Sequence, residues 1–500
     1  MPTRRRQVLC TLISGLSRLR LSATGIFPAS RLAASGVALI LVLTTAVCGA
    51  PARGPYATQL AAECDALIQA AVRRPFGWAW DNVPPTANSN APRHVTFERT
   101  DTPAAGLLLL LASQALEEPR FQEAAAQVSR GISSAQSGNG KFPEHAIFGT
   151  TSASSRDQPE AVLNRSATSG GLALMLLLHQ SIQNKTDPAT RAMPRALQFL
   201  VHQQADDGAW QSPYPSDATL RETQRLIRLD DSDYRDCTFT LLLAANVLGD
   251  VPSAAAAARS VNKLLALRLG TATIIPTTEP ADAPPVDEEI LRRNSNLWSS
   301  VYRPNGLLDP KLEQFPIGAD MIATRVAMQT LIGAYLVNGD RNAGQALDTA
   351  HRALIALQTQ DGQWRRIYPM QPTTAPVEVD TGSIFRAPST QPLRSLGTFD
   401  LPRTMENVNQ LKLLGRQRYL TMMAQPFSLE QRLAAAVCGL TDDPFALDLP
   451  LTAGEVDAYV KTHQADFAIL QRPIPQDLPS RLHRLWILLV RTRLEQMQQG

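Results

Sequence analysis

The 500-residue sequence lacks the short motifs that mark several large enzyme classes. None of its 7 histidines falls in a zinc-binding pattern, and there is no Gly-x-Ser-x-Gly elbow, P-loop or dinucleotide fingerprint. Net charge is small as well, +3 over the chain, with much of the excess before residue 55. The sequence therefore gives no support to zinc or serine hydrolysis, nucleotide chemistry or a basic surface for nucleic acid.

Cysteine is also scarce, and its 5 copies form no metal or redox motif. Cys10 and Cys48 fall in or at the end of the N-terminal leader described next. The remaining three, Cys64, Cys237 and Cys438, are an odd number at wide spacing. We expect them to be buried free thiols rather than members of a disulfide.

The first fifty residues have the pattern of an export signal. MPTRRRQ is positively charged, and the apolar run ASGVALILVLTTAVCGA (34–50) ends in small residues. This run is short for a comfortable membrane span. We predict a signal peptide over residues 1–50, or alternatively an uncleaved anchor. The protein is then exported, periplasmic or extracellular, and meets a membrane only through this segment.

A 12-residue pattern occurs twice, as QADDGAWQSPYP from Gln204 and QTQDGQWRRIYP from Gln358, with a weaker copy, QSGNGKFPEHA, from Gln136. Each copy closes a pair of helix-like segments. The first segment of a pair is almost wholly apolar, and the second has apolar residues three and four apart. A further pair over 236–268 has the same form, but Arg268 stands where Gln is expected and the Gly-x-Trp is lost.

Helix pairs that cannot bury their own faces close into a ring of inner and outer helices. We therefore predict an all-α fold, an α/α toroid (an incomplete barrel) of helix-hairpin repeats over residues 51–424. Residues 425–500 are predicted as its C-terminal helical closure. The Gln and Trp of the repeated pattern are interpreted as architecture, with the ring packing and the amide hydrogen-bonding across the turn.

The Gln-x-x-x-Gly-x-Trp element resembles the QW repeat of squalene and terpene cyclases. Extended to Tyr-Pro, it also resembles the pectic acid lyases of polysaccharide lyase family 10. Over residues 164–268 the order of motifs is closer to the lyases, through NRSATSGGLALMLLLHQ, QFLVHQQADDGAWQSPYP and RLIRLDDSDYRDCTF. The chain departs from the lyase pattern where Asn164, Arg165, Gly171 and Leu229 replace the family's Asp, Asn, Glu and Asn.

The resemblance implies a calcium-dependent lyase in which the metal bridges uronate groups and an unprotonated arginine removes the C5 proton. Carboxylates gathered at one helix start suit calcium, although helix capping also explains them. The predicted metal ligands are Asp230, Asp231 and Asp233. The predicted catalytic arginines are Arg235, Arg292 and Arg303, of which the last two rest on position alone. The predicted substrate-binding residues are Asn164, Arg165, Trp210 and Tyr214.

These inferences predict an exported pectate-lyase-like protein that acts on an acidic polysaccharide by β-elimination, with its catalytic competence left open. One alternative is a non-catalytic toroid that binds a glycan or a protein in the mouth of the ring. The missing acidic residues favour this alternative, whereas the retained Asp230–Asp231 pair favours the lyase. A terpene-cyclase-like enzyme is a further alternative, which the 6% aromatic content disfavours.

Overall fold

The computed structural model describes residues 54–81, 91–155, 165–182, 188–214, 224–270, 296–308, 318–369, 396–445 and 453–499. The chain divides into two units, Met1–Arg53 and Gly54–Gly500, and everything below concerns the second. The predicted leader lies outside the described residues. Among the helices that are described, none combines the length and apolar character that a membrane crossing requires.

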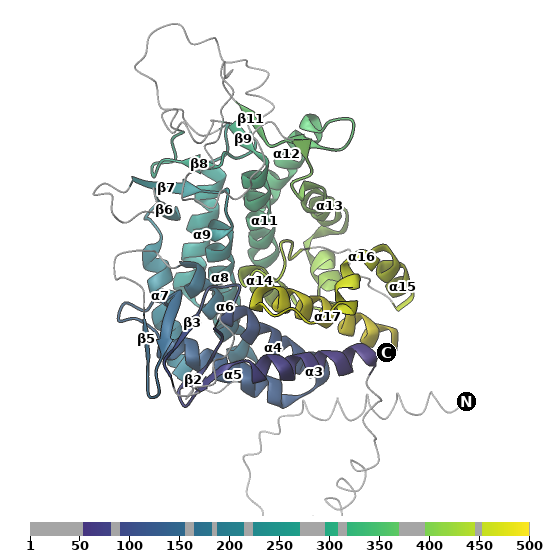
Figure 1. Cartoon of the computed structure of the whole chain (residues 1–500). Coiled ribbons are helices and arrows are strands. Elements are labelled where there is room, and N and C mark those ends of the chain that lie inside the picture. Colours follow the sequence, from purple (N-terminus) through teal and green to yellow (C-terminus); the bar gives the residue numbers. More distant parts are fainter. Residues whose placement is uncertain are drawn as a thin grey trace, which may run out of the picture. The chain divides into compact units, whose positions relative to one another are not determined.

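Four helix hairpins stand side by side and form two layers (Figure 1). The inner helices are α4 (Thr102–Leu116), α6 (Arg165–Ile182), α8 (Asp233–Leu248) and α11 (Met321–Asn338). Their outer partners are α5 (Pro119–Ser134), α7 (Pro188–Gln203), α9 (Val251–Ala266) and α12 (Arg341–Leu357). Each inner helix contacts the next inner helix, and each outer helix the next outer one. The predicted all-α toroid of helix hairpins is therefore confirmed.

Two more helices extend the inner layer at its ends. α3 (Pro55–Gln69) packs on α4, and α13 (Leu401–Met423) packs on α11. The two layers differ in composition as the sequence indicates. α4 is buried on every side through its run of leucines, whereas α12 buries one stripe that includes Ala343, Leu347 and Leu354.

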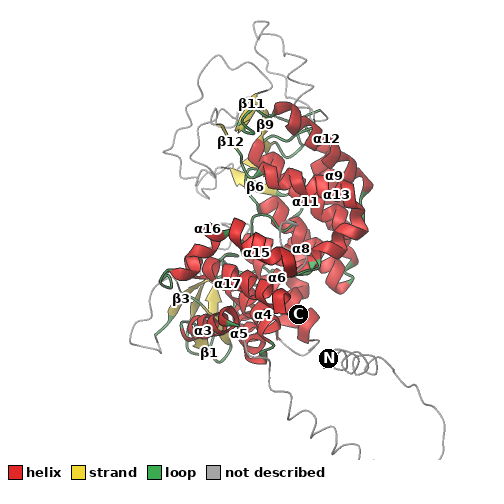
Figure 2. Ribbon diagram, turned by 90° about the vertical axis from the view of Figure 1, so that its right-hand side faces the viewer, coloured by secondary structure: helices red, strands yellow, loops and turns green. Residues whose placement is uncertain are grey.

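Short antiparallel strands form five small sheets among the described residues. They lie along one side of the helical layers (Figure 2), in the connections that lead into the inner helices α4, α6, α8, α11 and α13. The strands are β1 (Val72–Arg74), β2 (Gly77–Ala79), β3 (Arg93–Thr96), β4 (His145–Phe148), β5 (Ala153–Ser155), β6 (Gln211–Tyr214), β7 (Gln224–Arg228), β8 (Val301–Tyr302), β9 (Gly318–Asp320), β10 (Trp364–Arg365), β11 (Ile367–Pro369) and β12 (Leu396–Gly397).

The glutamine of the repeated pattern ties one hairpin to the next. Gln204 Nε2 donates to the carbonyl of Gly208 in its own turn, at 3.1 Å, and to that of Ala256 on α9, at 2.9 Å. Gln136 bonds in the same way to its own turn and to α7. Gln358, which follows α12, the last outer helix of the described residues, is exposed. The architectural interpretation of this glutamine is thus confirmed for Gln136 and Gln204, whereas Gln358 has no following hairpin to bond among the described residues.

The two tryptophans of the pattern bond different outer helices: Trp210 bonds Ser260 of the next hairpin, and Trp364 bonds the outer helix before it. Trp364 Nε1 donates to the carbonyl of Leu354, at 2.9 Å. In the hairpin over 236–268, which lacks the full pattern, Trp298 Nε1 donates to the equivalent carbonyl, that of Leu264, at 2.8 Å. The Gly-x-Trp is lost as expected, since Asn296 stands two residues before Trp298, but its tryptophan is retained. Residues 271–295, outside the described residues, separate Trp298 from α9 and hide the repeat from a comparison of spacings.

The C-terminal segment contributes α14 (Leu429–Val437), α15 (Ala453–Thr462), α16 (Gln464–Phe467), a 3-10 turn (Ala468–Gln471) and α17 (Leu478–Gln499). α14 packs against the inner helices α4, α6 and α8, on the side away from the outer layer. Ala434, Ala435 and Ala436 are fully buried there, and such small residues let helices approach closely. The inside of the arc of inner helices is therefore filled by the chain's own helix.

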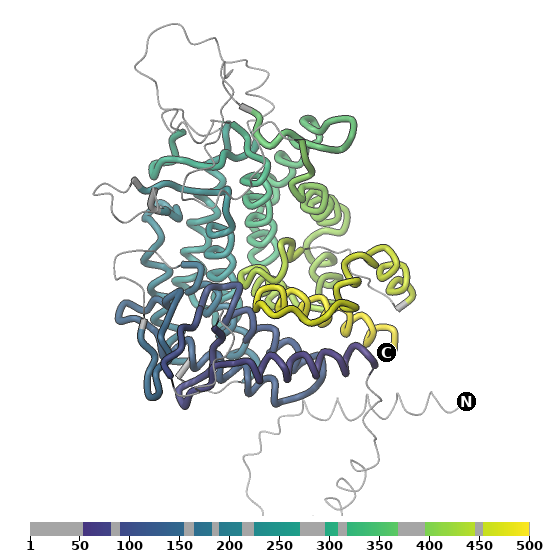
Figure 3. Tube along the Cα trace, in the orientation of Figure 1, coloured from purple at the N-terminus to yellow at the C-terminus, as the bar shows by residue number. Residues whose placement is uncertain are grey.

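The last helix joins the two ends of the described chain. α17 packs on α3 and α4, so that the yellow and purple parts of the tube run side by side (Figure 3). Arg484 of α17 makes a buried ion pair with Glu63 of α3, at 2.9 Å. Cys64 beside it, like Cys237 and Cys438, is a buried free thiol, as predicted.

Candidate functional site

The predicted acidic cluster lies where β7 leads into α8. β7 ends at Arg228 and α8 begins at Asp233, so the short connection carries Asp230 and Asp231 to the start of an inner helix. Arg228 grips Asp230 with two bonds, Nε to Oδ1 at 3.0 Å and Nη2 to Oδ2 at 2.9 Å. Asp233 bonds the buried guanidinium of Arg165, which projects from the start of α6. The structure therefore brings these predicted residues together.

This arrangement does not fit a calcium ion. Calcium takes six to eight oxygen ligands, and carboxylates supply its charge compensation. Here Asp230 and Asp233 are neutralised by Arg228 and Arg165, and Asp231 lies 3.8 Å from Arg228 while it accepts a bond from the backbone N–H of Asp233. A dication would have to displace two arginines. The contact of Asp231 with that N–H is a local turn contact before α8, whose N-cap is Ser232 and has no side-chain capping bond, so capping by Asp231 is not borne out either.

Asp231 is the most exposed member of the cluster, and its side chain is 36% accessible. Partial burial and the like charges of Asp230 and Asp233 raise the pKa of Asp231 to about 7, although Arg228 opposes the shift. A carboxyl group with a pKa near neutrality can hold or release a proton under physiological conditions.

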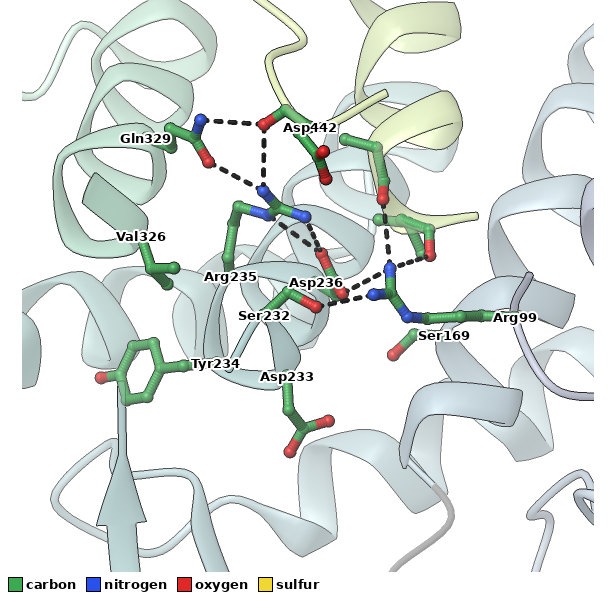
Figure 4. A network of polar contacts seen from close by, with 12 residues as sticks. Arg99, Ser169, Ser232, Asp233, Tyr234, Arg235, Asp236, Val326, Gln329 and Asp442 are labelled. Atoms are coloured by element: carbon green, nitrogen blue, oxygen red, sulfur yellow. Dashed lines mark hydrogen bonds and ion pairs between the residues drawn. The ribbon is translucent and has the colours of Figure 1, made fainter. Parts of the chain in front are cut away.

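Arg235, the first predicted catalytic base, lies in the first turn of α8 and is 3% exposed. Its guanidinium pairs with Asp236 at 3.0 Å, donates to Gln329 Oε1 of α11 at 2.7 Å and contacts the carbonyl of Asp442 at 3.3 Å (Figure 4). Gln329 donates to that same carbonyl at 2.8 Å. A general base must reach the substrate's proton within hydrogen-bond distance, and these protein partners surround Arg235 instead.

Sequence analysis missed Arg99, which holds the other side of the same network. Its guanidinium pairs with Asp236 Oδ2 at 2.9 Å and donates to the Val437 carbonyl at 3.0 Å, at the C-terminal end of α14. Figure 4 shows Arg99 and Arg235 approaching Asp236 from different sides. A cation at the C-terminal end of a helix satisfies its last carbonyls and the helix dipole. Arg99 therefore links the C-terminal end of α14 to the start of α8.

The other predicted site residues lie apart from this network or outside the described residues. Trp210 is 1% exposed, and its indole donates to Thr238 and Ser260, so it offers no surface to a substrate. Arg303 follows β8, which runs antiparallel to β7 with Val301 opposite Arg228, so the chain leads it away from the acidic cluster. Asn164 and Arg292 lie outside the described residues, and Tyr214 is described only as the end of β6.

Gly171, which stands where the lyase pattern has Glu, lies at a close approach rather than in a site. A Cβ placed on it would lie 2.7 Å from the Phe142 ring, in the turn that follows α5. Real Cβ atoms do not come so close, so this position has no room for a glutamate side chain. The close packing of Gly171 against Phe142 therefore excludes the glutamate that the lyase pattern has at this position.

A second group of metal-ligand side chains stands at the start of α4. Ligand atoms of Glu98, Glu144 and His145 lie within 4.8 Å of one another. Exposed acidic groups commonly gather without an ion, and Glu144 and His145 have other polar contacts. The group carries no metal assignment.

A cavity of about 610 Å³ opens beside the network, between the loop 438–445 and helices α15 to α17. Asp442, whose main chain is held by Arg235 and Gln329, also lines this cavity. Its aromatic lining includes Phe427 from the connection before α14, Tyr459 of α15, Phe467 of α16 and Trp486 of α17. Volumes of this size are typical of sites that enclose a small ligand.

Comparisons with known proteins identify no family. No family model matches the chain, and no curated protein does. Among solved structures, a variant family 10 polysaccharide lyase from Cellvibrio cellulosa, in complex with trigalacturonic acid, is similar with a TM-score of 0.36. It is 14% identical, and the match covers 65% of this chain and 100% of that one.

The cellobiose 2-epimerase of Spirochaeta thermophila is similar with a TM-score of 0.32 and 11% identity, over 64% of this chain and 90% of that one. Similarity at this level carries no information about what this chain binds or converts.

Proposed function

We propose that this chain binds a carbohydrate without cleaving it by β-elimination. The observation that carries the proposal is the position of α14, which packs inside the arc of inner helices and against the start of α8. The carbohydrate class rests on the resemblance of residues 164–268 to the pectic acid lyases. The chain has a toroid of helix hairpins, and its own α14 packs against the inner helices α4, α6 and α8 on the inside of their arc.

The electrostatics of the cluster support the same proposal. The metal-binding role of Asp230, Asp231 and Asp233 requires carboxylates that are available to a cation, and two of the three are neutralised by arginines. The catalytic role of Arg235 requires access to a substrate, and its guanidinium is committed to Asp236 and Gln329. Neither requirement is met in this arrangement.

A second candidate is elimination chemistry at the surface of the acidic cluster. Asp231 favours it, because a partly exposed carboxyl group with a pKa near 7 suits a general base. In that case Asp231, rather than Arg235, takes the proton.

The deciding experiment incubates the full-length protein with polygalacturonate, with added calcium and separately with chelator, and follows the ultraviolet absorbance of unsaturated uronate products. The proposal predicts no increase in absorbance, either with calcium or with chelator. Calorimetric titration with a panel of neutral and acidic oligosaccharides should then show binding. A calcium-dependent rise in absorbance contradicts the proposal and restores the lyase. A rise that Asp231→Asn abolishes supports the second candidate, and failure of every glycan to bind refutes carbohydrate recognition altogether.

A further inference from the structure

We infer that the cavity beside α14 and α17 binds a neutral sugar unit rather than a uronate. This inference rests on the proposed carbohydrate-binding function and adds a site and a ligand class to it. The cavity, about 610 Å³ in volume, is lined by aromatic, acidic and basic side chains together.

The aromatic part of the lining is held rigid. Trp486 of α17 stacks on Phe427 with ring centroids 5.2 Å apart and an angle of 24° between planes. Phe427 is 2% exposed and so fixes the half-buried indole from behind. Tyr459 stacks on His463 at 4.1 Å and adds a second planar surface. A sugar ring presents an apolar C–H face, and a pre-ordered aromatic plane buries that face without an entropic cost of ordering.

The polar part of the lining offers both acceptors and donors. The side chains of Asp442 and Asp466 are acceptors, and those of Arg472 and His483 are donors. Within the described residues, none of the four has a side-chain hydrogen bond or ion pair. Neighbouring sugar hydroxyls each donate and accept, so they can satisfy a carboxylate and a guanidinium at once.

Charge balance distinguishes a neutral sugar from a uronate. The lining holds three arginines, Arg403, Arg432 and Arg472, against three aspartates, Asp442, Asp443 and Asp466. Arg432 is already committed to backbone carbonyls, among them that of Phe427 at 3.1 Å. A ligand carboxylate would therefore meet as much negative charge as positive charge, and no excess of cations favours it. A neutral ligand has no such disadvantage.

The network in Figure 4 positions one wall of this cavity. The carbonyl of Asp442 accepts from Arg235 and Gln329, and this holds the loop whose side chain faces the cavity. Arg235, predicted as a base, thus acts here as a positioning residue.

The first test uses tryptophan fluorescence of the full-length protein. Four of its 6 tryptophans, Trp80, Trp210, Trp298 and Trp364, are at most 2% exposed. In a Trp78→Phe background, Trp486 is then the tryptophan that an added quencher such as acrylamide reaches. Cellobiose or maltose should protect Trp486 from the quencher, whereas digalacturonate should not.

The second test measures affinity by calorimetric titration of the same ligands into variants. Asp466→Asn and Arg472→Gln each remove a charged partner and should weaken binding of the neutral disaccharide about tenfold. Asp361→Asn, at an exposed turn after α12, is the matched control and should leave affinity unchanged.

The outcomes separate this inference from the proposed function. If neither cavity variant changes the affinity for the neutral sugar, the ligand binds elsewhere and the inference is overturned. Binding of digalacturonate but not of neutral sugars also overturns it, while carbohydrate binding itself stands. If no neutral or acidic glycan binds, the inference and the proposed function fail together.

Discussion

Replacement of Arg235 by glutamine tests whether this arginine is a structural clamp or a catalytic base. The change removes an ion pair with Asp236 in which the two side chains are 4% and 2% exposed. It also removes the contacts with Gln329 at 2.7 Å and with the carbonyl of Asp442 at 3.3 Å. Breaking a buried pair by removing one partner costs roughly 3–5 kcal/mol. Because Arg99 still neutralises Asp236, at 2.9 Å, we expect the free energy of unfolding to fall by about 3 kcal/mol.

The assay is equilibrium unfolding in urea, followed by circular dichroism, of the parent and two variants. The control is Arg418→Gln on the exposed side of α13, which removes the same charge and should change the free energy of unfolding by less than about 0.5 kcal/mol. Residues kept for catalysis commonly limit stability, so replacing a dedicated base is neutral or stabilising. An Arg235→Gln variant as stable as its parent would refute the clamp.

Three further predictions use the same unfolding assay. Gln204→Ala removes the donor that bonds the carbonyls of Gly208 and Ala256, so we expect the free energy of unfolding to fall by about 2 kcal/mol. The control Gln358→Ala, at an exposed position, should leave the free energy of unfolding almost unchanged, and equal losses in the two variants would contradict the role of Gln204 in joining two hairpins. Ala435→Leu adds volume where α14 packs against the inner helices, so we expect it to lower the free energy of unfolding by about 1–3 kcal/mol. The control Ala458→Leu, on exposed α15, should not lower it, and equal stability of the two variants would show that α14 is loosely packed. Because the pKa of Asp231 is raised to about 7, the folded state favours the neutral form of this carboxyl group. Asp231→Asn should therefore be as stable as the parent near pH 4 and more stable than the parent as the pH rises through 7. A difference in stability that does not change with pH would contradict the raised pKa.

The hairpin architecture could be predicted because its determinants are local. The Gln-x-x-x-Gly-x-Trp pattern encodes a glutamine that bonds four residues ahead, as at Gln136 and Gln204, and a buried tryptophan that bonds an outer helix. Both contacts recur with the repeat, so their periodicity is visible in the sequence. The hairpin that ends at α9 escaped this prediction because residues 271–295 intervene before Trp298. A local rule fails where an insertion changes the spacing.

The content of the site could be predicted only in part. Asp230, Asp231 and Asp233 do gather at an inner-helix start, but the arginines that neutralise them include Arg165, 68 residues from Asp233. The contact of Arg99 with Val437 joins residues 338 positions apart. The alanines of α14 predict a helix that packs closely, yet nothing in them specifies which helices it meets. The tertiary fold determines partners that lie so far apart in the sequence. The sequence pattern therefore predicts that the aspartates gather, but not that arginines neutralise them.

Amide hydrogen exchange of α14 tests the central claim most directly. Peptides that cover residues 429–437 should exchange as slowly as those of α8, and far more slowly than those of exposed α15, because the alanines of α14 are fully buried against the inner helices. Addition of polygalacturonate should leave this protection unchanged. Exchange of α14 at the rate of α15, or loss of its protection when the polysaccharide is added, would show that the helix leaves the inside of the arc and would contradict the account.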